Sequence, residues 1–174
     1  MFGSTNPWTD LRNADAILIV GSNVAQRMPV AIKHVMHAKS HGAKVLCVDP
    51  LVTESASAAD EYVPVMPGTD TAFVLGMINY AIMNGKFDRT YLISNTDAPY
   101  IVKKDFSYDR NKGIFSGYDA KTGTYPPGEF DYERDGRGNP LTDDEIRNPR
   151  TVFQLLKNHV SSYTPQRVAE ITGC

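Results

Sequence analysis

A glycine-led turn and two aspartates follow three short apolar runs, and these residue types suit a nucleotide ligand. Gly21-Ser22-Asn23 comes after the run Ala16 to Val20, Asp49 closes the run Lys44 to Val48, and Asp70 lies in Pro-Gly-Thr-Asp beyond a third run. The turn offers backbone N–H groups to a phosphate, an Asp at a strand end accepts hydrogen bonds from a sugar hydroxyl, and a further Asp accepts from a guanine edge. The sequence therefore predicts one crevice for a nucleotide-like ligand.

Each of these positions also has a purely structural interpretation. Gly21 suits a turn for conformational reasons, and Asn23 is typical of a helix cap. Asp49 precedes Pro50 as a turn residue does, and Asp70 is placed to cap the next helix. The turn lacks the G-x-G-x-x-G spacing of the NAD fingerprint, which disfavours an ordinary dehydrogenase.

The elements that position these residues form a βαβ crossover. Ala16 to Val20 is an unbroken apolar run, typical of a parallel strand covered on both faces. Pro29 suits the first turn of the following helix, Gly42 ends that helix, and Lys44 to Val48 is the second strand. A third, short strand is expected over Tyr62 to Val65, with its proline near an edge or a strand end.

Further helices and one irregular stretch complete the prediction of an α/β fold, a small parallel sheet flanked by helices. Helical patterns cover residues 9–12, 71–82, 88–94 and 151–160, a last helix opens at Thr164-Pro165, and 53–60 is a short helix or turn. Residues 107–150 are rich in Gly, Asp, Asn, Pro and Tyr and read as a long irregular excursion rather than a second folded unit. We expect a binding core over 1–106, the excursion over 107–150, and the C-terminal helices of the same domain over 151–174.

Composition narrows the function classes. The chain has 174 residues and a net charge of -2, which gives no electrostatic case for nucleic acid. No apolar run approaches the roughly 18 residues of a membrane span, and Met1 to Thr5 lack the pattern of a secretory signal, so we expect no membrane insertion and, as the chain stands, a cytoplasmic location. Of the two cysteines, Cys47 is expected to be a small buried hydrophobe.

Metal and catalytic signals are weak. His34, His37 and His41 have helical spacing, but no glutamate lies between them as in H-E-x-x-H, so a solvated helix face is favoured over zinc. The stretch 131–136 begins like an EF-hand loop, yet Thr142 occupies the twelfth position, which disfavours calcium. We find no activated nucleophile and no acid–base carboxylate pair, and therefore predict neither catalytic residues nor metal ligands.

Four segments, in order, resemble the catalytic subunit of molybdenum- or tungsten-dependent formate dehydrogenases, within the molybdopterin oxidoreductases. These segments are TNPWTDLRNADAILIVGSN, AKVLCVDP, ASAADEYVPVMPGTDTAFVLGMINY and TVFQLLKNHVSSYTPQRVAEITG. The Tyr- and Asp-rich excursion followed by QLLK and YTP resembles the respiratory, membrane-associated branch of these enzymes.

The resemblance implies that this segment helps to hold one of two molybdopterin guanine dinucleotides. Three groups of residues would line the pyrophosphate and ribose, the guanosine, and the guanine base in turn: Val20, Gly21, Ser22, Asn23, Val24, Ala25, Gln26 and Arg27; Val48, Asp49, Pro50, Leu51 and Val52; and Gly68, Thr69 and Asp70.

The same resemblance places other parts outside this chain. The Cys or selenocysteine metal ligand, its neighbouring His and an iron–sulfur cluster would precede the counterpart of Trp8. Expected partners are the rest of the catalytic subunit and an iron–sulfur electron-transfer subunit, with formate as the substrate and a periplasmic location for the parent enzyme. We therefore expect a fragment, such as a reading frame that starts downstream of an in-frame UGA selenocysteine codon.

Two departures from the family pattern keep alternatives open. Where the family usually has N-P-A-E-x-H-P, this chain has Asn23 to Pro29 as NVAQRMP, and D-P-R is replaced by Asp49-Pro50-Leu51. These changes favour a non-catalytic module with a degenerate binding site. Another reductase of the superfamily, such as one acting on nitrate, is the further alternative, although the stretch from Tyr118 to Ile171 argues against it.

Overall fold

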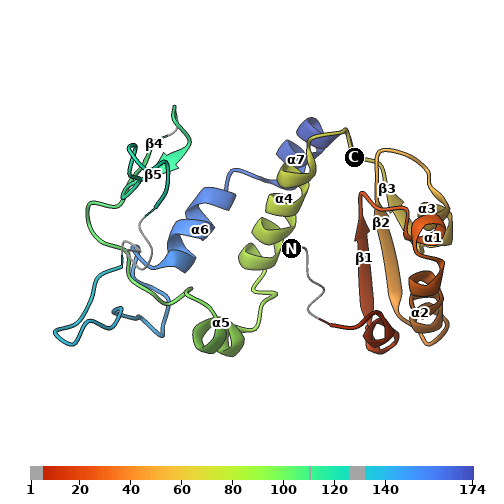
Figure 1. The fold of residues 1–174 in the computed structure, drawn as a ribbon, viewed down its shortest axis with the longest axis horizontal. Helices are drawn as coiled ribbons and strands as arrows, with labels where there is room; N and C mark the ends of the chain where they lie inside the picture. The colour runs from red at the N-terminus through yellow and green to blue at the C-terminus, as the bar shows by residue number, and fades with distance from the viewer. Residues whose placement is uncertain (1–5, 110, 126–131) are drawn as a thin grey trace. The chain divides into compact units, whose positions relative to one another are not determined.

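The computed structural model describes residues 6–109, 111–125 and 132–174 (Figure 1). The chain divides into two compact units. The first unit comprises Met1–Gly76 with Pro165–Cys174, and the second comprises Met77–Thr164.

The first unit contains a parallel sheet of three strands. The strands are β1 (Ala16–Val20), β2 (Lys44–Val48) and β3 (Glu61–Val63), in the order β1-β2-β3. Ala16 pairs with Lys44 at one end of β1, and Leu46 pairs with Glu61 on the other side of β2. The predicted small parallel sheet is confirmed. The third strand begins and ends earlier than predicted, because Pro64 has no backbone N–H for the ladder.

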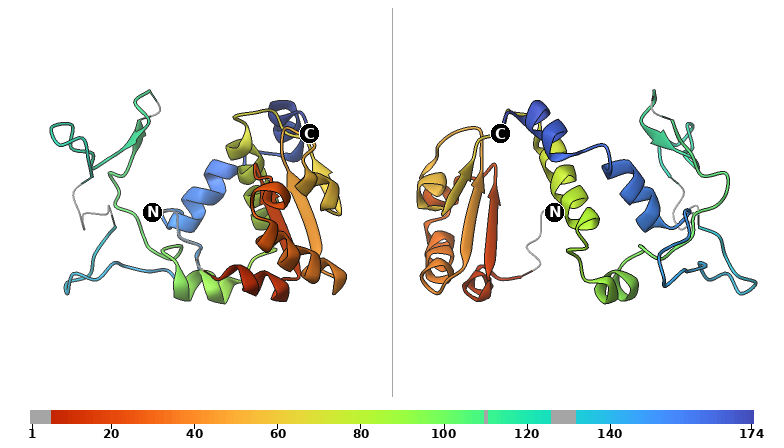
Figure 2. Two further views of the ribbon diagram at one scale, coloured as in Figure 1. Left: turned by 45° about the vertical axis from the view of Figure 1, so that its right-hand side comes forward. Right: turned by 180° about the vertical axis from the view of Figure 1, so that it is seen from behind.

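Helices cover one face of this sheet, as both Figure 1 and Figure 2 show for α1, α2 and α3. The 3-10 helix η1 spans Trp8–Asn13, and α1, α2 and α3 span Val24–Arg27, Pro29–Ser40 and Glu54–Ala58. Their buried side chains form one core with alternate residues of β1 and β2, among them Ile17, Ile19, Val35, Val45 and Cys47. Cys47 has no exposed surface, as predicted, and burial raises the pKa of its thiol.

The main helix of the crossover begins at Pro29, as predicted, and a separate short helix, α1, precedes it, with a break at Met28. Met28 has φ −137° and ψ 65°, outside the helical region, and it serves as the end of α1 and the start of α2. A proline restricts the residue before it to extended conformations, so Pro29 explains the break. The turn after β1 is therefore followed by only four helical residues.

Two further helices belong partly or wholly to this unit. Helix α4 spans Asp70–Met83 and α7 spans Pro165–Thr172, which begins at the predicted proline. The α-carbon of Gly76 lies so close to α7 that an added Cβ would meet Cγ2 of Val168 at 2.6 Å. The backbone N–H of Met66 donates to the carbonyl of Thr172 at 2.8 Å, which fixes the segment before α4.

The second unit combines helices with short strand pairings. Helix α5 spans Arg89–Asn95 and α6 spans Val152–Val160, while β4 (Tyr108–Asp109) and β5 (Ile114–Phe115) form an antiparallel pair (Figure 2). Ala98, Ile146 and Phe153 form its buried cluster. Isolated bridges join residues 100–102 to 132, 142 and 151, so part of the Gly- and Asp-rich stretch is held against the helical part of the unit.

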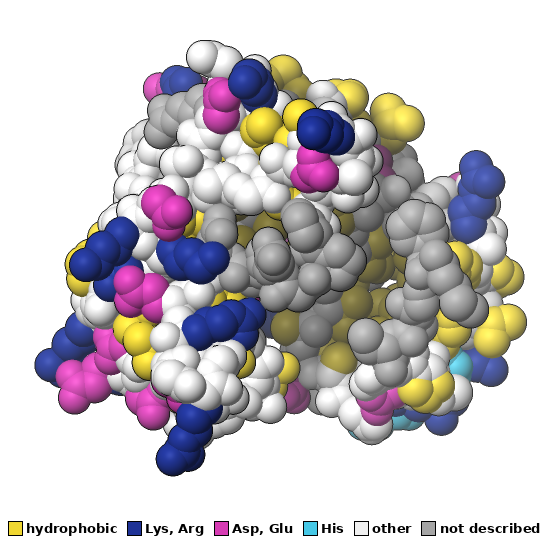
Figure 3. All heavy atoms as spheres, turned by 60° about the vertical axis from the view of Figure 1, so that its left-hand side comes forward, with side chains coloured by type: hydrophobic (Ala, Val, Ile, Leu, Met, Phe, Trp, Pro, Cys, Tyr) yellow, Lys and Arg dark blue, Asp and Glu magenta, His cyan; other side chains and the backbone are white. Residues whose placement is uncertain are grey.

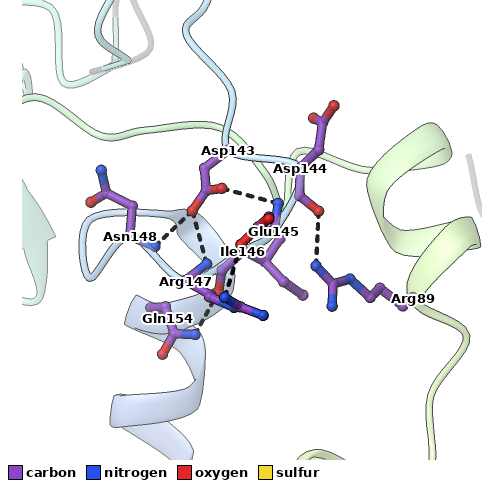
Figure 4. A network of polar contacts seen from close by, with 8 residues as sticks. All are labelled: Arg89, Asp143, Asp144, Glu145, Ile146, Arg147, Asn148 and Gln154. Atoms are coloured by element: carbon purple, nitrogen blue, oxygen red, sulfur yellow. Dashed lines mark hydrogen bonds and ion pairs between the residues drawn. The ribbon is translucent and has the colours of Figure 1, made fainter.

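A tight loop at Asp143 organises the end of that stretch (Figure 4). One Asp143 oxygen accepts from the N–H of Glu145 at 3.0 Å, and the other accepts from the N–H groups of Arg147 and Asn148 at 2.8 and 2.7 Å. These contacts hold the buried Ile146 at φ 48°, a left-handed conformation that is uncommon for a β-branched residue. The loop therefore places one apolar side chain in the core, and its backbone adopts a strained conformation at that residue.

Candidate functional site

The turn after β1 is built on Gly21. Its φ is 57°, a region that favours glycine, and an added Cβ would meet no atom within 4 Å. Its N–H donates to the carbonyl of Val48 at 2.9 Å, which joins the carboxyl ends of β1 and β2. The first two predicted positions thus lie at one edge of the sheet.

Asn23 does not act as the predicted side-chain cap, although it occupies the cap position of α1. Its side-chain oxygen instead accepts from the N–H and the hydroxyl of Ser55 at 3.4 and 3.3 Å. Its side-chain nitrogen donates to the carboxylate of Glu54 and to the side-chain amide oxygen of Gln26. This hydrogen bond from Asn23 holds the pKa of Glu54 below its usual value. The Ser55 hydroxyl also accepts from the N–H of Ala25 at 2.9 Å.

Ser55 is the residue that sequence reasoning missed. It has no exposed surface and connects the turn after β1 to α3, which follows β2. A serine in an Ala- and Ser-rich stretch carries no local signal of such a contact, because its partners lie about thirty residues earlier. The Asn23–Ser55 contact makes the two turns one hydrogen-bonded assembly.

Asp49 lies at the carboxyl end of β2 and is 7% exposed. Its N–H donates to the carbonyl of Val63 at 3.2 Å, and one carboxylate oxygen accepts from the N–H of Leu51 at 2.9 Å. The turn interpretation of Asp49 is therefore confirmed, while a contact with a sugar stays a prediction. The exposed fractions of Leu51 and Val52 are 71% and 73%, so an apolar surface follows this turn.

The third position, Gly68 to Asp70, lies between β3 and α4. Gly68 has φ 81°, and the carbonyl of Thr69 accepts from the N–H of Phe73 at 3.2 Å, which makes Thr69 the cap residue. Asp70 is the exposed first residue of α4 rather than its cap. Its carboxylate accepts no hydrogen bond from the described residues, and the residue is exposed, so the carboxylate oxygens are available as acceptors.

Some of the remaining predicted site residues are buried and others are exposed. The side chains of Val24 and Val48 are 9% and 1% exposed, so only their backbone can face a ligand. Val20 and Arg27 are exposed at the first turn, and Pro50 at the second. Hydrogen bonds link the turns at Gly21 and Asp49, whereas within the described residues none joins Gly68 to Asp70 to either of them.

Comparison with known proteins identifies the family. Residues 2–106, more than half of the chain, match the family described as Molybdopterin oxidoreductase. The chain belongs to the molybdopterin oxidoreductases. This membership implies a molybdopterin cofactor that carries molybdenum or tungsten.

Individual relatives within this family are much longer. The chain is 41% identical, over 97% of its length, to formate dehydrogenase 2 subunit alpha (cytochrome c-553) of Nitratidesulfovibrio vulgaris and to the formate dehydrogenase-O major subunit of Escherichia coli. It spans 16% of the length of each. In fold, it is similar to acetylene hydratase from Pelobacter acetylenicus, with a TM-score of 0.56 and 23% identity over 92% of this chain and 15% of that one.

The candidate site combines three kinds of surface that could contact a ligand. Positive-φ glycines with open space beside them suit a phosphate, exposed apolar residues suit the face of a ring, and an exposed carboxylate suits N–H donors. In the described ranges, no group of three or more His, Cys, Asp or Glu residues is arranged to hold a metal ion.

The three histidines of α2 and its C-terminal end lie in different environments. His34 is buried, contrary to the predicted solvated face, and its Nδ1 accepts from Nε of Arg12 at 2.8 Å. Burial lowers the pKa of His34. His37 and His41 are exposed and stack with ring centroids 4.3 Å apart.

The remaining acidic stretch, the surface charge and the helix hydropathy indicate no other ligand. The EF-hand-like stretch begins at Asp131, outside the described residues, while Asp135 accepts from the N–H groups of Arg137 and Asn139 in its own turn. Acidic and basic side chains are interspersed on the face drawn in Figure 3. In the part of the chain that the structure describes, no helix is long and apolar enough to cross a bilayer.

Proposed function

We propose that this chain forms part of the molybdopterin guanine dinucleotide site of a formate dehydrogenase catalytic subunit. The observation that carries the proposal is the 41% identity to formate dehydrogenase subunits over 97% of the chain. The turns at the carboxyl ends of a parallel sheet support it, because open α/β sheets bind nucleotides at that edge.

Each turn has a distinct role in this proposal. Residues 20–27 contact the pyrophosphate and ribose through backbone N–H groups, with the exposed guanidinium of Arg27 as a cation at the same turn. Residues 48–52 approach the guanosine, where the exposed Leu51 and Val52 cover apolar ring surface. Gly68 to Asp70 meet the guanine, whose paired N–H donors match the Asp70 carboxylate.

Helix-dipole stabilisation of the pyrophosphate is small at this turn. Helix α1 has four residues, and the N–H of Ala25 already donates to Ser55. The macrodipole of so short a helix is small. Recognition of the pyrophosphate therefore depends mainly on the N–H groups of the turn and on Arg27.

The bound cofactor would supply the metal centre at which formate is oxidised to CO2, with the electrons passing to iron–sulfur clusters. The residues of this chain orient the dinucleotide end and do not contact the reacting atoms. Residues 1–106 are the binding core, and 107–150 and 151–174 extend the same domain. The partners are the rest of the catalytic subunit and an iron–sulfur subunit, and the parent enzyme is periplasmic.

A chimera tests this proposal. The chain replaces the 170 matched residues of the Escherichia coli formate dehydrogenase-O major subunit, and the purified protein is assayed for GMP released from the pterin cofactor. We expect the chimera to release about one GMP for each position that holds a dinucleotide. Asp70→Asn should weaken retention of the dinucleotide about tenfold, because a charged hydrogen bond is lost.

The matched control is Asp88→Asn, because Asp88 caps α5 by accepting from the N–H of Tyr91 and asparagine also caps helices. Retention should match the parent chimera in this control. A folded chimera that retains the second dinucleotide but lacks the one bound by this segment would identify a degenerate binding module and refute the proposal.

A further inference from the structure

A pair of exposed histidines lies at the C-terminal end of α2. His37 is in the last turn of the helix, and His41 directly follows the last helical residue, Ser40. The two imidazole rings are stacked, with centroids 4.3 Å apart and planes 18° apart. His34, by contrast, is buried and contacts Arg12. The structure therefore separates the three histidines of the sequence pattern into one core residue and one surface pair.

A hydrogen bond fixes the tautomer of His41. Its Nδ1 lies 2.8 Å from the backbone carbonyl oxygen of His37, and the same oxygen accepts from the hydroxyl of Ser40 at 2.7 Å. Because a carbonyl oxygen only accepts, we assign the proton of the neutral ring to Nδ1 and the lone pair to Nε2. Histidines that bind metals usually have this arrangement, in which one ring nitrogen donates to a carbonyl and the other is the ligand.

The stacked rings need one rotation to bind the same ion. Residues four apart on a helix place their side chains on one face, one turn apart. Zinc binds imidazole nitrogens at about 2.0–2.1 Å, so two ligand nitrogens lie about 3 Å from one another. Rotation of the His37 ring about χ2, a torsion with broad minima, turns one of its nitrogens toward Nε2 of His41. Within the part of the chain that the structure describes, no hydrogen bond restrains the His37 ring.

The charges around the pair admit a cation. Carbonyl groups at the C-terminus of a helix carry partial negative charge, which favours a cation near the last turn. Of the two lysines of α2, Lys39 is already paired, with Nζ 2.7 Å from the carbonyl oxygen of Ala58 and 3.2 Å from the Asp60 carboxylate. Lys33 is exposed one turn before His37, so its charge opposes the binding of a metal ion.

We propose that His37 and His41 form a bidentate surface site for a divalent transition-metal ion that prefers nitrogen ligands, such as Zn²⁺, Ni²⁺ or Cu²⁺. Water completes the coordination, because the described residues bring no third His, Cys, Asp or Glu to the pair. The bound ion links both sides of the turn at Gly42, which has φ 102° and leads into β2. The site lies at the amino end of β2, away from the turns at Gly21 and Asp49, and is independent of the proposed function.

Calorimetric titration of the complete chain with Ni²⁺, without a histidine tag and near neutral pH, is the first test. We expect about one ion per chain, and His37→Asn and His41→Asn should each weaken binding at least about tenfold, because either substitution removes one of two ligands. Both residues are exposed, so neither substitution disturbs the core. Lys33→Gln should tighten binding, because it removes the opposing charge.

His159→Asn is the matched control. His159 is also an exposed histidine in the last turn of a helix, α6, and this substitution should leave the affinity unchanged. Binding that persists unchanged in both His37→Asn and His41→Asn would overturn the proposal, as would an equal loss in His159→Asn. Mg²⁺ binding as tight as that of Ni²⁺ would overturn it too, because Mg²⁺ prefers oxygen ligands.

Hydrogen exchange with and without Zn²⁺ tests the effect on the turn. The N–H of Gly42 donates to the carbonyl of Lys39 at 3.0 Å, and that of Ala43 donates to the carbonyl of Ala38 at 3.1 Å. Saturating Zn²⁺ should slow the exchange of these two amides at least about fivefold, because the ion binds only the closed turn. The slowing should be absent in His41→Asn. Unchanged exchange in the parent chain at saturating Zn²⁺ would refute the link across the turn.

Discussion

Replacing Ser55 by alanine should uncouple the two turns of the candidate site. The substitution removes the acceptor of the Ala25 N–H at 2.9 Å and the donor to Asn23 at 3.3 Å, while the backbone of α3 is unaffected. Ser55 has no exposed surface, so water cannot replace these contacts without local opening. A buried donor left unsatisfied costs about 1–3 kcal/mol, and a typical lost hydrogen bond about 1 kcal/mol. We expect the free energy of unfolding of the first unit to fall by about 2 kcal/mol.

Urea unfolding followed by hydrogen exchange of core amides in β2 measures this change without assuming that both units unfold together. Ser57→Ala is the matched control on the same helix, because Ser57 is exposed and its hydroxyl donates to the carbonyl of Thr53. Its effect should stay within about 0.5 kcal/mol. If Ser55→Ala also stays within that range, the hydrogen bonds do not hold the turns together, and the rigid two-turn assembly inferred above is wrong.

Two further predictions concern the second unit. Ile146 has φ 48° and is 5% exposed, so Ile146→Gly and Ile146→Ala both remove core packing. Glycine also relieves the strain of the left-handed conformation. In thermal unfolding, Ile146→Gly should therefore be about 1 kcal/mol more stable than Ile146→Ala, the reverse of the usual order. The N–H groups of Asn148, Arg147 and Glu145 hold the pKa of Asp143 below its ordinary 3.8, so its stabilisation is complete above that pH and is lost as the pH falls through the lower folded value. Unfolding free energies measured from pH 6 down to about 2 should decline less steeply for Asp143→Asn, and an unchanged slope would contradict the assignment.

The sequence was most informative where one pattern had one physical solution. Ala16 to Val20 and Lys44 to Val48 are apolar runs of strand length, and the structure places strands over both. The start of α2 at Pro29 was predicted from the proline itself, which restricts the conformation of Met28 before it. The separate helix α1 before it was not predicted, because four residues are too few to show a periodic pattern.

Contacts between distant segments were not predictable in this way. Ser55, the burial of His34 against Arg12 and the left-handed Ile146 each depend on partners brought together by the fold. A polar side chain has several acceptable local partners, so its sequence neighbourhood does not select the long-range one. The assignment of Asn23 as a side-chain cap failed for this reason, because Ser55 and Glu54 compete for the same amide group.

The geometry of the site also bears on what cofactor binding would require of the chain. Hydrogen bonds through Asn23 and Ser55 fix the Gly21 turn relative to α3 before any ligand binds. A dinucleotide at Gly21 would therefore meet a turn that is already ordered, and little conformational entropy of that turn would be lost on binding.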